Sequence, residues 1–253
     1  MTPRSRLVVV VGLLLVGAGC VAPTSQSAPP PGLDDDAVTD ASALVRAHTS
    51  ALESRSFTVR STTTTRPPDD DYRVVLNRTW RVDPTGPFRG SVVGTSEAVG
   101  DAPERYARHP DERASWREGT TTYRRVSADG DATYRRVGLF NASVKLSAAL
   151  QRQTLYRLNT RTEATVTPVT QDGSRLYRID AQLNDTAVTT NASMTLLVDT
   201  DGIVRTIRTN RTVQYRSGNR VVTRTVRIED VGATTVERPD WYPEAVDATR
   251  TDD

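Results

Sequence analysis

The spacing of hydrophobic residues predicts a helix near the start of the folded part of the chain. Between residues 41 and 55, apolar positions recur every three or four residues and form one stripe, which must pack against another element. Thr39 or Asp40 precedes the stripe, and either side chain can cap the free N–H groups of a first helical turn. The members of the stripe are Ala41, Leu44, Val45, His48 and Leu52.

From Phe57 onward the period changes to two, which predicts antiparallel strands with one buried face and one solvated face. In residues 72–82 hydrophobic and polar residues alternate, and Arg78 interrupts the alternation. A second helix is predicted from about residue 145 to residue 158, before the strands resume. The later alternating segments are residues 177–183, 194–198, 203–215 and 222–228.

Four short turn sequences separate these segments and predict tight hairpins, because Asp-Gly supplies the positive φ angles that such turns need. The first turn joins two copies of the string TYRRV, and a two-residue loop places Tyr123 opposite Arg136 and Arg125 opposite Tyr134. Each pair can stack a guanidinium on a ring, which we interpret as sheet chemistry and not as a binding site. The four turns are Asp129-Gly130, Asp172-Gly173, Asp201-Gly202 and Ser217-Gly218-Asn219.

Two helices cannot cover both faces of about nine strands, so we expect them to share the concave face of a curved sheet. The predicted fold class is α+β: a strongly curved antiparallel sheet, or half-open barrel, of about nine or more strands with two helices on the concave face. A cavity between helices and sheet would have these candidate lining residues: Leu44, Leu52, Val74, Leu76, Trp80, Leu146, Leu150, Ile179 and Leu196.

The first 19 residues have the three-part pattern of a signal peptide. Arg4 and Arg6 precede an apolar run, and the small residues Gly17-Ala18-Gly19 lead directly into Cys20, the single cysteine. This segment resembles a lipobox, with Gly17 where an aliphatic residue is usual. We therefore predict that Cys20 is lipidated after cleavage and anchors the protein at the extracytoplasmic face of the cell membrane. A signal peptide that contains a cysteine by chance, or a permanent transmembrane anchor, is the alternative.

The charge balance gives no indication of nucleic-acid binding. Removal of residues 1–19 takes away Arg4 and Arg6 and no acidic residue, so the 33 basic residues fall to 31 and equal the 31 acidic ones. Hydrophobic residues make up only 36% of the chain, which predicts a thin core.

Several segments together resemble an uncharacterised family of haloarchaeal lipoproteins. They are the lipobox-like start, VTDASALVRAH, the Asp-Gly hairpins, VDTDGIVR at 198–205 and VERPDW at 236–241. The neutral net charge departs from the usual acidity of haloarchaeal proteins. More remotely, the order of elements is similar to the LolA and LppX/LprG class of lipoprotein carriers, which implies a helix-plugged half-barrel with a cavity for acyl chains.

The predicted organisation follows from these patterns. Residues 1–19 are the signal peptide, residues 20–37 a lipidated flexible tether rich in Pro, Ser and acids, and residues 38–243 a single LolA/LppX-like β-rich domain. Residues 244–253 are expected to be a polar tail.

No catalytic motif stands out, so we predict that the protein is not an enzyme and uses no cofactor or metal. Gly94-Thr95-Ser96 lacks the second glycine of a nucleophile elbow. We assign His48 to packing and His109 to a solvated loop, because the two histidines form no ligand set. The acidic runs 34–36 and 69–71 lack the spacing of a calcium loop.

Two surface features leave binding functions open. Arginines on the late strands could attract anionic headgroups or glycans, although such charges usually only solvate a sheet; they are Arg205, Arg208, Arg211, Arg216, Arg220, Arg224 and Arg227. Five asparagines begin N-x-S/T sequons and are candidate glycosylation sites. They are Asn77, Asn141, Asn184, Asn191 and Asn210.

The functional prediction is a membrane-anchored, non-enzymatic lipoprotein that binds or carries a hydrophobic or lipid ligand in a half-barrel cavity. The alternative is an envelope module that binds protein or glycan and has no ligand cavity. The predicted partners are therefore membrane lipid through Cys20, a lipid ligand, or an envelope protein or glycan, and not nucleic acid.

Overall fold

The computed structural model describes residues 28–85, 88–103, 112–137 and 142–250. These residues form one antiparallel sheet of 11 strands. The first six strands are consecutive neighbours: β1 (Phe57–Arg66), β2 (Arg73–Asp83), β3 (Arg89–Val99), β4 (Glu112–Glu118), β5 (Thr121–Ala128) and β6 (Asp131–Val137). The other five are β7 (Arg161–Gln171), β8 (Ser174–Leu183), β9 (Thr189–Asp199), β10 (Val204–Tyr215) and β11 (Gly218–Glu229).

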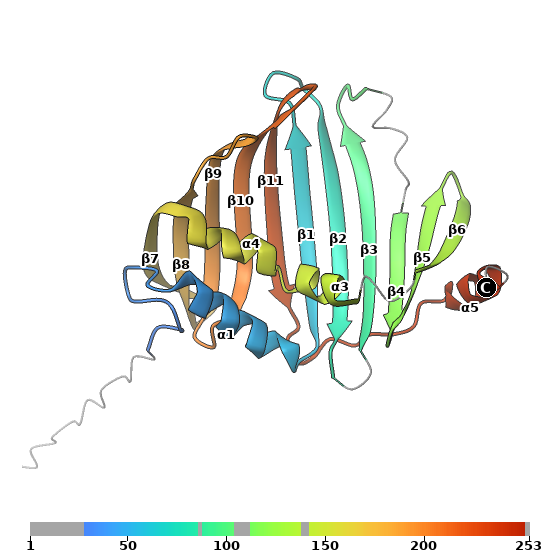
Figure 1. Cartoon of the computed structure of the whole chain (residues 1–253), viewed down its shortest axis with the longest axis horizontal. Coiled ribbons are helices and arrows are strands. Elements are labelled where there is room, and N and C mark those ends of the chain that lie inside the picture. The colour runs from blue at the N-terminus through green and yellow to red at the C-terminus, as the bar shows by residue number, and fades with distance from the viewer. Residues whose placement is uncertain (1–27, 86–87, 104–111, 138–141, 251–253) are drawn as a thin grey trace, which may run out of the picture.

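The two runs of strands join where the first strand pairs with the last. The strand order is β6-β5-β4-β3-β2-β1-β11-β10-β9-β8-β7, so β1 and β11 form a seam near the middle of the sheet. Figure 1 shows α1 (Ala41–Glu53), α3 (Ala142–Ala149) and α4 (Arg152–Tyr156) across one face of this sheet. The predicted fold class, a curved antiparallel sheet with helices on its concave face, is confirmed.

The hairpins follow the Asp-Gly turns. Asp129 and Gly130 have φ angles of 53° and 87°, and Asp172 and Gly173 have 51° and 75°, as tight primed turns require. The predicted register between the two TYRRV copies is also confirmed, with Tyr123 opposite Arg136 and Arg125 opposite Tyr134.

One apolar core lies between α1 and the C-terminal half of the sheet. Asp40 caps α1 by accepting a hydrogen bond from the N–H of Ala43 at 2.9 Å. Leu44 and Leu52 from the predicted stripe are almost fully buried, against Leu196 of β9 and its neighbours. The stripe at helical spacing therefore meets the inward side chains of the strands.

The packed part of the chain begins before residue 38. Leu33 and Val38 are buried in the core, and the N–H of Val166 on β7 donates to the carbonyl of Asp36 at 3.0 Å. Gly32, at φ +86°, lies so close to α1 that a Cβ atom would stand 2.0 Å from the Asp40 carbonyl oxygen. The last residues of the predicted tether, from about residue 30, are thus part of the folded domain.

The predicted second helix is broken. After α3, Gln151 takes a left-handed conformation at φ 55°, and the chain starts again as α4, followed by the 3-10 turn η2 (Arg157–Thr160). The spacing of the leucines changes at the break, from four residues between Leu146 and Leu150 to five between Leu150 and Leu155, and both Leu150 and Leu155 reach the core.

The C-terminal segment is also more ordered than predicted. Residues 244–248, expected in a polar tail, belong to α5 (Tyr242–Ala248), whose Ala245 is fully buried. The Tyr242 ring meets Tyr123 edge-on with centroids 5.2 Å apart, and the Trp241 ring stacks on Tyr134 at 6.3 Å. Through these aromatic residues α5 packs against β5 and β6, far from α1 (Figure 1).

Candidate functional site

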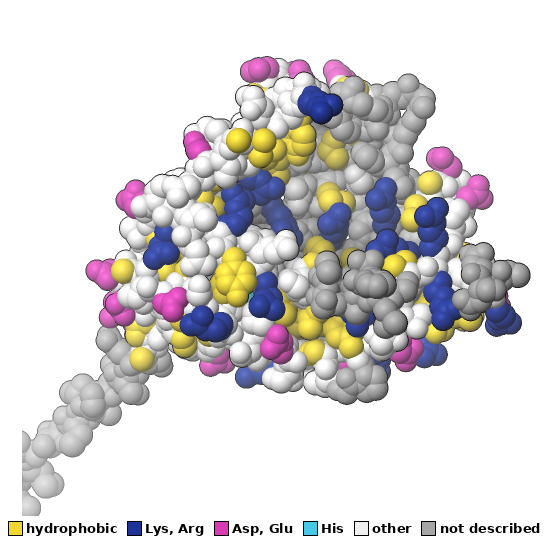
Figure 2. All heavy atoms as spheres, viewed as in Figure 1, with side chains coloured by type: hydrophobic (Ala, Val, Ile, Leu, Met, Phe, Trp, Pro, Cys, Tyr) yellow, Lys and Arg dark blue, Asp and Glu magenta, His cyan; other side chains and the backbone are white. Residues whose placement is uncertain are grey.

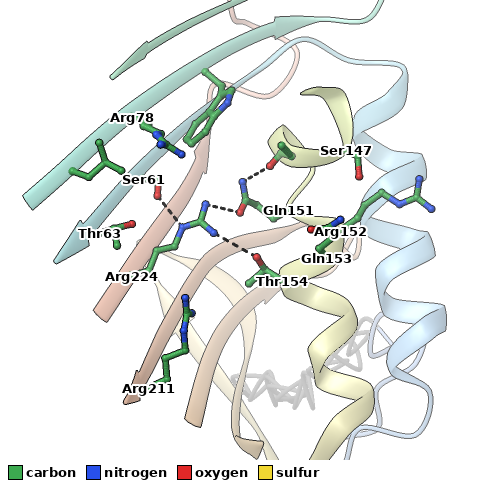
Figure 3. A pocket seen from close by; sticks show the side chains of 13 residues that line it. Ser61, Thr63, Arg78, Ser147, Gln151, Arg152, Gln153, Thr154, Arg211 and Arg224 are labelled. Atoms are coloured by element: carbon green, nitrogen blue, oxygen red, sulfur yellow. Dashed lines mark hydrogen bonds between the residues drawn. The ribbon is translucent and has the colours of Figure 1, made fainter. Parts of the chain in front are cut away.

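A pocket of about 700 Å³ lies between the α3–α4 segment and the concave face of β1, β2, β10 and β11. Figure 2 shows this face hollowed beside the seam, with basic side chains in and around the hollow. Figure 3 shows the same pocket at close range. Its lining residues are Ser61, Thr63, Leu76, Arg78, Trp80, Ser147, Ala148, Gln151, Arg152, Gln153, Thr154, Arg211 and Arg224.

Arg224 of β11 lies in the pocket between the sheet and the α3–α4 segment. Its Nε donates to Ser61 Oγ at 3.1 Å, one terminal nitrogen donates to Gln151 Oε1 at 2.9 Å, and the other to Thr154 Oγ1 at 3.5 Å. The guanidinium thus bridges the sheet and the α3–α4 segment (Figure 3). All three acceptors are neutral, so its positive charge is held in place without being balanced.

Two further arginines line the same pocket as Arg224, one from β2 and one from β10. Burial lowers the pKa of Arg224, and the charges of Arg78 on β2 and Arg211 on β10 lower it further. The pKa of Arg157 is lowered in the same way, first by burial and then by Arg211. Arg78, Arg211 and Arg224 all line this one pocket, so these three residues form a cationic cluster.

Among the described residues, no carboxylate forms an ion pair with any member of this cluster. Arginines elsewhere in the molecule do find acids. Arg205 contacts Asp199 at 2.7 Å, for example, and Arg238 contacts Glu118 at 2.7 Å. The lining of the pocket therefore holds four arginines and no acidic side chain.

Three of the lining residues are apolar. Leu76 and Trp80 lie on either side of Arg78 along β2, and Ala148 lies on α3. A ligand held here would touch apolar and guanidinium groups next to one another.

The predicted lining residues divide between core and pocket. Leu76 and Trp80 line the pocket, while Val74 and Leu146 are half-buried and are not among its lining residues. The remaining five are packed in the solid core and face no open space: Leu44, Leu52, Leu150, Ile179 and Leu196. These five side chains pack together in the core between the helices and the sheet, so they do not line a cavity.

Strand register separates the arginines that the sequence grouped together. Arg224 pairs with Thr63 and Thr209, which places it on the concave face. Arg211 shares this face, whereas Arg208 and Arg227, one register position out of phase, lie on the convex face. Arg78 was not predicted as a site residue, although it interrupts an inward-facing apolar series in the sequence.

His48 is a structural residue. The ring is fully buried, its Nε2–H donates to the Leu150 carbonyl at 3.0 Å, and its Nδ1 accepts from the N–H of Val204 at 3.1 Å. Burial lowers the pKa of His48 to about 4, and the charge of Arg205 adds to this effect. The ring is therefore neutral and ties α1 to the helix break and to β10.

The remaining candidate residues are dispersed. Cys20, His109 and Asn141 lie outside the described residues. Within the described ranges, no group of three His, Cys, Asp or Glu side chains could hold a metal ion, and no helix is long and apolar enough to cross a membrane. The four described sequon asparagines are exposed at separate sites: Asn77, Asn184, Asn191 and Asn210.

The sequence matches one protein family, and the fold is distantly similar to several solved structures. The family described as "Family of unknown function (DUF7537)" matches residues 5–245. No curated protein matches the sequence.

Three solved structures illustrate the distance of the structural likeness. LprF from Mycobacterium bovis is 13% identical, with a TM-score of 0.39, over 79% of this chain and 96% of that one. The MucA/MucB complex of Pseudomonas aeruginosa is 15% identical, with a TM-score of 0.36, over 78% of this chain and 59% of that one. A putative outer membrane lipoprotein-sorting protein domain from Vibrio parahaemolyticus is 8% identical, with a TM-score of 0.27, over 82% of this chain and 99% of that one. Similarity at this level does not establish a shared function.

Proposed function

Because the chain belongs to DUF7537, a family of unknown function, we propose its function from the pocket itself: the protein binds a lipid or similar amphipathic ligand outside the cell membrane. The observation that carries this proposal is the open space of about 700 Å³ between the concave face and α3–α4. Small-molecule sites are typically concave spaces of about 300–1,000 Å³, and this pocket has that size. Its lining is mostly polar, with Leu76, Trp80 and Ala148 as the apolar members, which suits an amphipathic ligand with a large polar part.

The pocket favours a ligand carrier over an envelope module without a cavity. A docking surface for protein or glycan needs no hollow under a helix pair, whereas a ligand that must be shielded from water does. The size of the pocket therefore supports lipid binding over the envelope module without a cavity.

The proposed location rests on the N-terminal sequence. The lipobox-like segment before Cys20 supports lipidation at that cysteine, which would hold the domain beside the lipids that it binds. Glycosylation at Asn77, Asn184, Asn191 or Asn210 is compatible with such a location, since all four side chains are exposed.

The pocket can be tested by filling it. Thr63 on β1 lines the pocket, and its neighbour Thr62 is exposed on the other face of the same strand. We expect Thr63→Trp to lower the affinity for dimyristoylglycerol at least about tenfold, because the indole occupies ligand space, while Thr62→Trp changes it less than about twofold. Tryptophan quenching or native mass spectrometry measures the binding.

Lipids retained by the protein give a second readout. Native mass spectra of protein purified from its own cells should show bound lipid for the wild type and for Thr62→Trp, and less for Thr63→Trp. The proposal is wrong if no lipid co-purifies and neither dimyristoylglycerol nor dimyristoyl phosphatidate binds to the wild-type protein.

A further inference from the structure

Arg224 is half-buried, and the half-buried Arg211 and the exposed Arg78 line the same pocket, whose lining includes no acidic side chain. Removing a guanidinium from water costs free energy unless an opposite charge or a full set of hydrogen bonds replaces the water. Arg224 donates to Ser61, Gln151 and Thr154, all of which are neutral. A protein that only needed to fill this space would place neutral residues here.

The cluster is built from separate parts of the chain. Arg78 comes from β2, Arg211 from β10 and Arg224 from β11, on both sides of the β1–β11 seam. In Figure 3 the labelled side chains of Arg78, Arg211 and Arg224 extend over the same part of the sheet, whereas the guanidinium of Arg152 points away from them. Solvated surface charge does not require convergence of this kind.

Space is also kept open beside Arg78. Gly94 on β3 pairs with Arg78, and a Cβ atom at Gly94 would lie 3.3 Å from Cγ of that arginine. On β1, the small residues Ser61 and Thr63 lie between β2 and β11 and leave the arginine side chains uncovered. Several guanidinium groups around one space can form paired hydrogen bonds to the oxygens of a tetrahedral anion.

We propose that the ligand carries a phosphate or sulfate group and that Arg78, Arg211 and Arg224 bind this anion. The inference rests on the proposed function, because it names the headgroup chemistry of the same ligand. The apolar side chains of Leu76 and Trp80, which lie on either side of Arg78 along β2, contact the adjoining hydrocarbon. The same anion chemistry could come from a lipid headgroup or from a free ion, and the experiment separates these two sources.

Arg211 is the residue to change, because Arg224 holds structural hydrogen bonds that Arg211 does not. Arg208 on the same strand is the matched control, since it lies on the convex face and its replacement removes the same charge. We expect Arg211→Gln to weaken dimyristoyl phosphatidate binding about tenfold or more and Arg208→Gln to weaken it less than about twofold. Binding of dimyristoylglycerol, which has the same chains and no phosphate, should not change in either variant.

Two further measurements complete the test. Thermal unfolding should show that both variants fold as the wild type does, and raising the salt concentration should weaken phosphatidate binding more than diacylglycerol binding. Inorganic phosphate and sulfate are added as competitors and measured alone by calorimetry. We expect each to compete with phosphatidate in the wild type and not in Arg211→Gln.

The outcomes distinguish this inference from the proposed function. Equal affinity for phosphatidate and diacylglycerol, unchanged by Arg211→Gln, overturns the anion site and leaves lipid binding standing. Binding of inorganic phosphate through Arg211 without binding of either lipid overturns the proposed function and leaves the anion site standing. No binding of any probe overturns both.

Discussion

At the scale of single residues, His48 shows how a buried polar group can join three elements. Its two ring nitrogens are both satisfied, one by the Leu150 carbonyl and one by the Val204 N–H, and this requires the neutral ring. A protonated ring would have to donate from both nitrogens, and the N–H of Val204 cannot accept. The same hydrogen bonds that fix α1 therefore exclude the charged form.

This arrangement predicts a stability that depends on pH. In the unfolded chain the ring binds a proton below about pH 6.5, whereas in the folded protein its pKa is about 4. The contribution is fully present above pH 6.5 and is lost as the pH falls toward 4. We expect the free energy of unfolding to be about 2 kcal/mol lower at pH 5 than at pH 8 from this group.

Urea denaturation at the two pH values measures this difference, and His48→Gln is the control. Glutamine does not titrate, so the variant should lose most of the pH dependence while being less stable at pH 8. The side chains with lowered carboxyl pKa values, Asp40, Asp83 and Asp180, act below this window. An equal loss of stability in the wild type and in His48→Gln would contradict the prediction.

The arginines show what the sequence can say about a site at this scale. Alternation alone marks Arg78 as a charge in an inward series, and Arg224 stands in phase with Val222 and Val226. Their convergence with Arg211 depends on the order β2-β1-β11-β10, which joins strands far apart in the chain. The residues of the site could therefore be suspected one by one from the sequence, but not brought together.

At the scale of elements, the break between α3 and α4 positions the pocket. Gln151 has a left-handed backbone, which costs a non-glycine residue about 1 kcal/mol. Its side chain gains the hydrogen bond to Arg224 and another to the Ala148 carbonyl. The sequence carried a signal for this break, because the five residues from Leu150 to Leu155 depart from the helical interval of three or four, although both leucines are buried.

The packing of α5 against β5 and β6 was not predicted, for a different reason. Trp241 and Tyr242 were visible in the sequence, but their partners Tyr134 and Tyr123 lie more than 100 residues earlier. A short polar segment whose one buried residue is Ala245 has no periodic signal. In contrast, the hairpins and α1 could be predicted, because their determinants are local.

The α5 contacts predict that the β5–β6 hairpin depends on this helix. Tyr242→Ala removes the edge contact with Tyr123 and the stacking with Arg238 at 4.7 Å. We expect amide exchange in residues 121–137 to become about tenfold faster, a loss of about 1–2 kcal/mol in local opening free energy. Amides of β8 and β9, in the main core, should not change.

Arg250→Ala is the control for this prediction. Its ion pair with Asp247 is largely exposed at both ends and contributes little. Hydrogen exchange measured by mass spectrometry resolves the hairpin from the rest of the sheet. A uniform acceleration over all strands in Tyr242→Ala would show that α5 supports the whole domain and not one flank.

At the scale of the whole molecule, the proposed anchor and the pocket lie in separate segments. All residues that line the pocket fall between Ser61 and Arg224, and Cys20 precedes the described domain. With residues from about 30 onward packed on the domain, the segment from Cys20 to Ala28 spans at most about 30 Å. An anchored protein would thus hold its domain close to the membrane surface.

We therefore predict that Cys20→Ser releases the protein without changing its ligand affinity. In the native cells the variant should move from the membrane fraction to the soluble fraction, and Ser25→Ala, in the same segment, should stay at the membrane. Detergent phase partition and intact-mass measurement of the wild-type protein check the modification. Wild-type protein in the aqueous phase with an unmodified or absent Cys20 would contradict the prediction.

The seam between β1 and β11 ties ligand binding to the completion of synthesis. β1 ends at Arg66, and the strand that must lie beside it begins only at Gly218. Since the pocket takes walls from both sides of this seam, a chain that ends before β11 lacks part of the pocket. If the pocket binds the proposed ligand, such incomplete molecules would not compete for it.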